Sequence, residues 1–335
     1  MSLPTRMSYG FIALLIIAAG WLHLATPLVT VLFCFFALHM LAFGGRKWLS
    51  VALFLILLTG VGVGFYFFVQ HSYKAIPEIA EKTIPVVLQW TEEKGIELPF
   101  TDYASLKALA INTVKKEIDG IGKYAGVAII QLAAIIIGVV VAISLFINSR
   151  FDLETDKPAQ TNNLYTITAT EIAQRFATFY ESFATVMGAQ IAISAINTVL
   201  TAGFLFWNDL PYAKVLVGVT FLCGLVPIIG NLISNTLIVG VGFTVSPNMA
   251  LASLVFLVVL HKLEYFLNSK IIGDRIRNPM WLTLIGLVLG EKLMGIPGMI
   301  LAPVILHYIK VEAKRSRVAR SQGGGEKIVT GEAVS

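Results

Sequence analysis

The chain has 335 residues, of which 56% are hydrophobic and only 13% are Asp, Glu, Lys or Arg. A soluble domain carries about 25% charged residues to cover its surface, so much of this chain needs lipid as its cover. The net charge of +5 is modest and spread along the chain, which excludes the concentrated basic face of a nucleic-acid-binding protein. We therefore expect an all-α polytopic integral membrane protein.

Long windows without a charged residue predict the membrane-spanning helices. A spanning helix needs about 20 apolar residues, and these windows lack the alternation of barrel strands. The first span is expected to be an uncleaved anchor, because no small-residue cleavage site follows it. Three spans fall within 1–70, and about six full spans are expected in all, at 8–25, 27–45, 49–70, 124–147, 189–207 and 249–267.

Polar segments interrupt and follow these spans. Residues 71–123 have apolar positions at helical spacing on both sides of a break at 95–101, which predicts a small extracytoplasmic insert of two amphipathic helices. We expect it to pack on the bundle or on a neighbouring subunit, with substrate capture as the alternative. Residues 148–188 predict a cytoplasmic linker and an amphipathic helix with a phenylalanine stripe. Residues 310–335 predict a basic, partly disordered cytoplasmic tail.

The arginines predict the orientation. Placing Arg6 on the cytoplasmic side puts every arginine of the chain on that same side, as the positive-inside rule requires. Both termini are then cytoplasmic, and the 71–123 insert is external.

Two apolar segments of the C-terminal half, 189–309, are interrupted where a span should continue. Residues 213–245 break at 226–231, and residues 281–309 break at 290–298. Each arm of the first segment has about 14 residues, or about 21 Å of helix, which is short of a hydrocarbon core of about 30 Å. We therefore expect two broken or re-entrant hairpins whose tips enclose a transport site. The alternative is two pairs of tilted, kinked spans.

Polar and flexible residues at these breaks form the candidate pathway. His261 and Glu264 lie three residues apart on one helix face, and ionisable residues inside a membrane are functional candidates. The alternative is that such side chains reach out to the interface. The expected pathway residues are Pro227, Gly230, Asn231, His261, Glu264, Asn268, Glu291, Lys292, Gly295 and Gly298.

Motifs of enzymes are missing from the sequence. It contains no HExxH, no Gly-rich phosphate loop followed by Lys-Ser/Thr and no CxxC, and its five histidines lack metal-ligand spacing. We therefore expect neither an enzyme nor a cofactor or metal site, and no ATP-driven pump in this chain.

Three motifs follow one another in the C-terminal half: LVPIIGN at 225–231, LEYFLNSKIIGDRIRNP at 263–279 and GLVLGEKLMGIPGMILAPVILHYIK at 286–310. With the layout of nearly the whole chain, this order resembles the autoinducer-2 exporter family of membrane transporters. The resemblance implies export of a small polar signalling molecule in some members and exchange of Na⁺ for H⁺ in others. It also implies a cyclic homo-oligomer, with a pentamer as the expected number.

These observations predict a secondary transporter that exports a small polar solute, an autoinducer-2-like molecule or similar, with the proton gradient as the candidate driving force. One alternative is a Na⁺/H⁺ antiporter, for which only Glu264 and Glu291 offer a carboxylate at membrane depth. The alternative from another class is a non-transporting membrane scaffold that presents the 71–123 insert to partners. The expected location is a bacterial cytoplasmic (inner) membrane.

Overall fold

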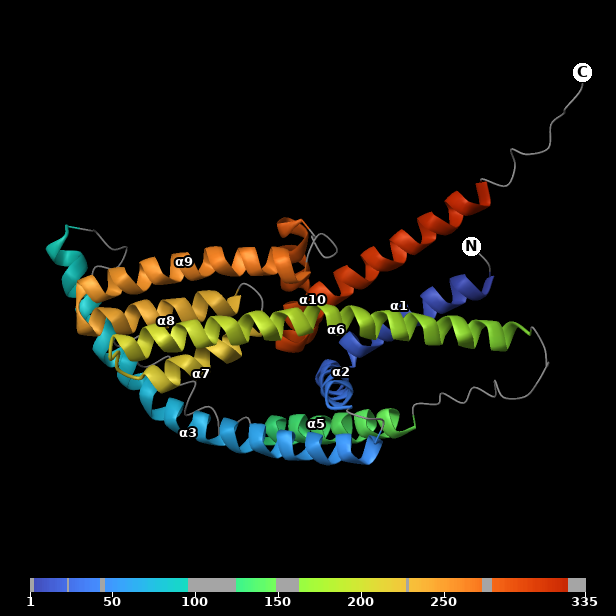
Figure 1. Cartoon of the computed structure of the whole chain (residues 1–335), viewed down its shortest axis with the longest axis horizontal. Helices are drawn as coiled ribbons and strands as arrows, with labels where there is room; N and C mark the ends of the chain where they lie inside the picture. The colour runs from blue at the N-terminus through green and yellow to red at the C-terminus, as the bar shows by residue number, and fades with distance from the viewer. Residues whose placement is uncertain are drawn as a thin grey trace, which may run out of the picture. The chain divides into compact units, whose positions relative to one another are not determined.

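The computed structural model describes residues 3–22, 24–42, 46–95, 125–148, 163–226, 229–272 and 279–324. Every element in these ranges is an α-helix, as predicted (Figure 1). Within the described residues, α1, α3, α5, α6, α9 and α10 each contain a stretch long and apolar enough to cross a membrane. The helices are α1 (Leu3–Trp21), α2 (Ala25–Met40), α3 (Lys47–Glu93), α5 (Ala125–Ile147), α6 (Leu164–Trp207), α7 (Ala213–Gly224), α8 (Ile229–Val245), α9 (Pro247–Ile272) and α10 (Met280–Gly324).

The chain divides into two compact units. The first unit comprises Met1–Ala25, Arg150–Gly188 and Asp274–Ser335, and the second comprises Thr26–Ser149 and Ala189–Gly273. Helix α6 therefore contributes its N-terminal half to the first unit and its C-terminal half to the second.

Helix α3 is one continuous helix of 47 residues, across the boundary that the sequence suggested after residue 70. At 1.5 Å per residue it is about 70 Å long, more than twice the thickness of a hydrocarbon core. Part of α3 must therefore lie outside the hydrocarbon, and its charged residues from Lys74 onward mark that part. The helix ends at the predicted break, where Gly95 has a φ of 65°. The second predicted helix of the insert, at 103–121, lies outside the described residues.

Two other helices differ in length from their predicted spans. The side chain of Asn163 accepts a hydrogen bond of 2.8 Å from the backbone N–H of Thr166, which caps the start of α6. From there α6 continues through the predicted boundary at 188 to Trp207. Helix α2 has 16 residues and is shorter than the predicted 27–45 span.

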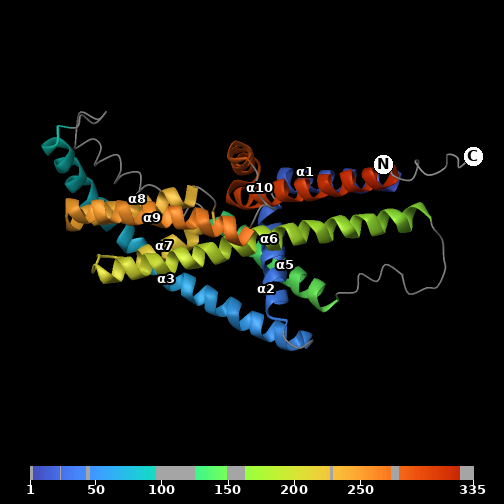
Figure 2. The same cartoon turned by 45° about the horizontal axis from the view of Figure 1, so that its top comes forward.

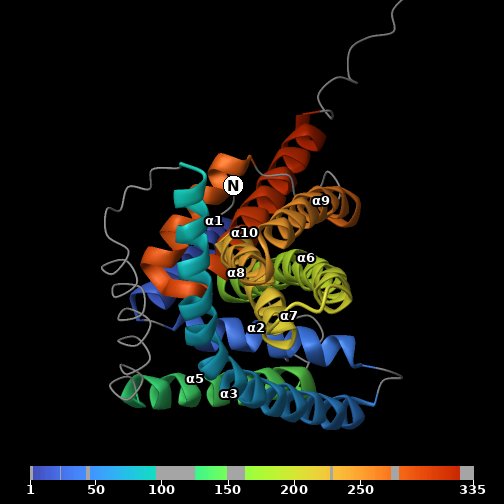
Figure 3. The ribbon, with the colours of Figure 1, turned by 90° about the vertical axis from the view of Figure 1, so that its left-hand side faces the viewer.

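The described residues of the second unit form two apolar cores. The α2–α3–α5 core gathers Cys34, Leu38, Val51, Phe54, Ala142 and Phe146. The other core joins α7, α8 and α9, which lie side by side, with the distal half of α3 and the end of α6 (Figures 2 and 3). The Trp90 ring of α3 and the Phe243 ring of α8 lie 5.3 Å apart between centroids, so the distal half of α3 packs on α8 of its own chain.

In the first unit, α10 consists of two arms joined by a sharp reversal at Gly295. This residue has φ 63° and ψ −147°, a conformation that is open to glycine and strained for other residues. A Cβ atom added to Gly298 would collide with the backbone oxygen of Gly290, and one added to Gly286 would lie 3.2 Å from Leu306. The arms therefore run against each other, and the predicted break at 290–298 is the turn of a helical hairpin.

A buried ion pair joins α1, α6 and α10 within the first unit. The Arg175 guanidinium donates to Glu312 and to Glu171 over 2.8 Å each, and the Tyr9 hydroxyl donates to Glu312 over 2.8 Å. The Arg175 and Glu312 side chains are only 10% and 6% exposed. Phe179, Phe183 and Val186 of the predicted phenylalanine stripe are buried on the same helix, whereas Phe176 is 44% exposed.

Candidate functional site

The break between α7 and α8 exposes backbone groups that need partners. The last four carbonyls of a helix have no partner within it. At the end of α7, the Phe221 carbonyl accepts a hydrogen bond of 2.9 Å from Ser194, and the Gly224 carbonyl accepts one of 2.6 Å from Gln190. The two carbonyls between them accept from backbone N–H groups of the turn that follows. Side chains of α6 and the turn together satisfy the end of α7.

Glycine allows α8 to begin against the end of α7. A Cβ atom added to Gly230 would collide with the backbone carbonyl of Cys223, and backbone cannot move aside as a flexible side chain can. This close approach puts Asn231 in the first turn of α8, beside the break.

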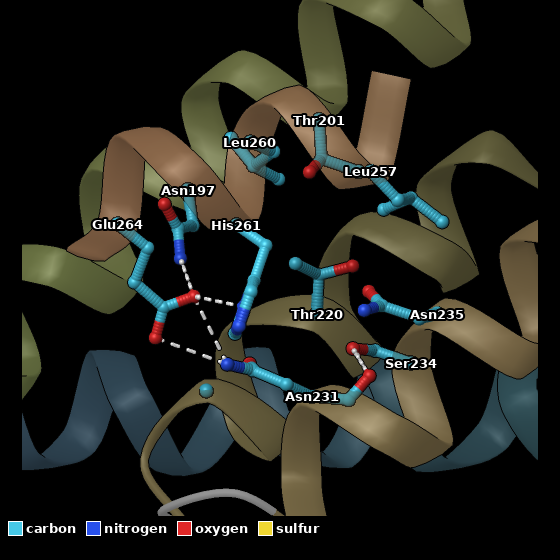
Figure 4. A pocket seen from close by; sticks show the side chains of 11 residues that line it. Asn197, Thr201, Thr220, Asn231, Ser234, Asn235, Leu257, Leu260, His261 and Glu264 are labelled. Carbon is cyan, nitrogen blue, oxygen red and sulfur yellow. Dashed lines mark hydrogen bonds and ion pairs between the residues drawn. The ribbon is translucent and has the colours of Figure 1, made fainter. Parts of the chain in front are cut away.

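Glu264 of α9 is held by two amide groups. The Nδ2 atom of Asn231 lies 3.0 Å from each carboxylate oxygen, and Nδ2 of Asn197 on α6 donates to Oε2 over 3.2 Å (Figure 4). The Glu264 side chain is 15% exposed. Hydrogen bonds from amides stabilise an ionised carboxylate, so the site joins α6, α8 and α9 around one negative charge.

A cavity of about 20 Å³ lies beside this carboxylate, which is room for about one water molecule. Two atoms that line the cavity, Oδ1 of Asn197 and Oγ1 of Thr201, are buried and have no hydrogen-bond partner among the described residues. A buried polar atom left unpaired costs about 1–3 kcal/mol, so these acceptors suit a proton donor or a small cation. The lining residues are Asn197, Thr201, Thr220, Gly224, Asn231, Ser234, Asn235, Leu257, Leu260, His261 and Glu264.

His261 lies at the open edge of this cavity. Its Nδ1 atom is 3.8 Å from Oε2 of Glu264, one helical turn away on α9, and its side chain is 63% exposed. The cavity therefore has a mostly shielded carboxylate inside and an exposed imidazole at its rim.

Some of the residues expected from the sequence meet at this site, and others lie elsewhere. The second unit brings together Gly230, Asn231, His261 and Glu264. In the first unit, Glu291 and Lys292 form an ion pair of 3.5 Å with side chains 49% and 77% exposed, beside the Gly295 and Gly298 turn of α10. Pro227 and the side chain of Asn268 lie outside the described residues.

Sequence reasoning missed the polar residues that complete the site. Asn197 and Thr201 come from α6, and Thr220, Ser234 and Asn235 come from α7 and α8. A signal was present, because α6 carries polar residues at 190, 194, 197 and 201, spaced 4, 3 and 4 apart within a charge-free window. That spacing places them on one helix face.

Comparison with known proteins supports a transport role. Residues 7–316 match the family model described as AI-2E family transporter. The chain is also similar to YdbI of Bacillus subtilis (strain 168), a candidate transport protein, with 28% identity over 159 residues. That similarity covers 47% of this chain and 45% of YdbI. The family is one of transporters and not of enzymes. Because the family match extends over most of the chain, and the helices form a polytopic membrane fold, the chain belongs to the AI-2E family of membrane transporters.

Proposed function

We propose that this protein is a secondary transporter in which proton binding at Glu264 drives the export of a small polar solute. The observation that carries the proposal is the carboxylate of Glu264, which accepts amide hydrogen bonds from two other helices beside a broken hairpin. Ionisable groups at such positions in a membrane are costly and mark ion pathways, and broken helices mark transport sites.

Protonation of Glu264 changes which partners it needs. The carboxylate accepts hydrogen bonds, but a carboxylic acid also donates one. The unpaired Oδ1 of Asn197 can accept that proton after its amide rotates, because rotation exchanges the Nδ2 and Oδ1 atoms. At the same time the acid accepts hydrogen bonds from Asn231 less strongly than the carboxylate does. The contact between α9 and the first turn of α8 is therefore weaker.

The weaker contact between α8 and α9 is how proton binding would open the site. A cavity of about 20 Å³ has no room for a solute of several heavy atoms. We propose that the start of α8 moves away from α9 when Glu264 is protonated, and that solute binds in the space so formed. Deprotonation restores the amide contacts and closes the site.

A second candidate, a Na⁺/H⁺ antiporter, rests on the size and chemistry of the same cavity. Room for about one water is also room for a small cation without its water shell, and hard cations prefer oxygen ligands. Glu264 supplies one negative charge, and the buried oxygens of Asn197 and Thr201 have no donor in the described structure.

Flux measurements in liposomes test the proposal and separate the two candidates. Purified protein is reconstituted, a pH gradient is imposed, and proton movement is followed with small polar solutes, Na⁺ or Li⁺. Glu264→Gln should reduce gradient-driven flux to the level of protein-free liposomes, because the amide cannot bind the proton. Glu92→Gln, at an exposed glutamate of α3, is the matched control and should transport normally. Full coupling in Glu264→Gln would overturn the proposal.

A further inference from the structure

We infer that His261 relays protons between water and Glu264. The inference rests on the proposed proton coupling at Glu264 and adds the residue through which the proton passes. Its basis is the geometry of the cavity rim, where an imidazole that is 63% exposed lies 3.8 Å from a carboxylate that is 15% exposed. A carboxylate that is mostly shielded from water exchanges protons faster when an exposed titratable group lies beside it.

The other cavity residues are poorly suited to this task. The residues contributed by α6, α7 and α8 are amides, hydroxyls and a glycine, so none of them is charged. The Thr220 and Ser234 hydroxyls donate to carbonyls of their own helices, at 2.8 Å and 3.2 Å. Among the described lining residues, Glu264 is thus the only charged group facing His261, and the adjoining Lys262 is exposed.

Imidazole has the chemistry that a relay needs. It is the one side chain that ordinarily titrates between about pH 5 and pH 8, and its two nitrogens can take up and release a proton on different sides of the ring. In the inward step, Nε2 of His261 takes a proton from water, and Nδ1–H passes its proton to Oε2 of Glu264. An O–H bond of a hydronium ion breaks as the Nε2–H bond forms, and the Nδ1–H bond breaks as the O–H bond of Glu264 forms. The ring is then neutral again, as its other tautomer.

The 3.8 Å distance sets one condition on this step. It is longer than a hydrogen bond between nitrogen and oxygen, so transfer requires a small rotation of the exposed ring or one bridging water. Both are available at the rim, because the His261 side chain is largely free of packing.

His261→Gln tests the relay, since glutamine keeps a polar side chain but cannot carry a proton. In liposomes under a pH gradient, this variant should transport more slowly than the native protein. Added histidine on both sides of the membrane, a zwitterionic imidazole, should restore the rate, while glycine at equal concentration should not. His71→Gln, at an exposed histidine of α3, serves as the matched control with normal transport.

Two results would overturn the inference. One is a His261→Gln variant that transports at the rate of the native protein. The other is slow transport that histidine does not restore, combined with a lower unfolding temperature, since that is the mark of a structural role. Failure of the underlying proposal gives a different result. In that case transport by Glu264→Gln would stay coupled to the pH gradient, whether or not His261 is replaced.

Discussion

Asn231 contacts both carboxylate oxygens of Glu264 through a single amide nitrogen, 3.0 Å from each. This residue therefore provides most of the hydrogen bonding that stabilises the ionised form. Asn197 provides the remaining described contact, at 3.2 Å. The position of the Glu264 carboxylate should therefore depend on Asn231 more than on Asn197.

Replacing Asn231 by leucine should reduce proton-coupled flux, because it removes the amide that contacts both carboxylate oxygens of Glu264. A hydrogen bond to a charged group is worth about 1.5–3 kcal/mol, so the loss should be large. The flux measured in liposomes under a pH gradient gives its size. Asn235→Leu, one turn further along α8, should reduce flux less; equal losses would contradict this role of Asn231.

The Arg175 ion pair should matter for stability. Removing one partner of a buried ion pair leaves the other charge uncompensated, at a cost of about 3–5 kcal/mol. Arg175→Met should therefore lower the unfolding temperature in detergent, and Arg175→Met combined with Glu312→Leu should recover part of the loss. Lys82→Met removes an exposed partner of Glu78 and should change the temperature little. A double variant as unstable as the single one would argue against this account.

At the scale of elements, the two helical breaks could be predicted because glycine and proline act locally. The sequence indicated both 226–231 and 290–298, and the structure has a turn at each. The side chains that form hydrogen bonds with the ends of these broken helices could not be predicted in the same way. Gln190 and Ser194 reach the end of α7 only because α6 packs against it. Such packing between helices cannot be predicted from the residues that neighbour each position. The Arg175–Glu312 pair was missed for the same reason, because its partners are 137 residues apart.

The contact between Gly230 and the end of α7 gives a prediction about the hairpin as an element. Gly230→Ala puts a Cβ atom into the Cys223 carbonyl, so α8 must move and carry Asn231 away from Glu264. Both the unfolding temperature and proton-coupled flux should fall. Gly203→Ala, on α6 with open space around it, should leave both unchanged or raise stability by up to about 1 kcal/mol. Normal flux in Gly230→Ala would show that the close approach is dispensable.

At the scale of the whole molecule, α3 gives the clearest test of membrane orientation. Its apolar N-terminal half is long enough to span the hydrocarbon, and its charged half follows. The arginine distribution predicts that the start of α3 is cytoplasmic and its end external. Since α3 is one continuous helix, a single pair of positions reports on both sides.

Single cysteines at Trp48 and Glu92, introduced after Cys34 and Cys223 are replaced by alanine, should label differently in intact cells. An impermeant thiol reagent should modify the cysteine at position 92 and should reach position 48 only after the cells are opened. The reverse pattern would invert the predicted topology.

The central claim is that Glu264 gains and loses a proton inside its cavity, and infrared difference spectroscopy of the protein in lipid bilayers tests it most directly. Lowering the pH should produce a protonated-carboxyl band in the native protein. The account predicts that this band is weaker in Glu264→Gln by the contribution of one carboxyl group and unchanged in Glu92→Gln over the pH range of transport. A spectrum of Glu264→Gln identical to that of the native protein would contradict the account.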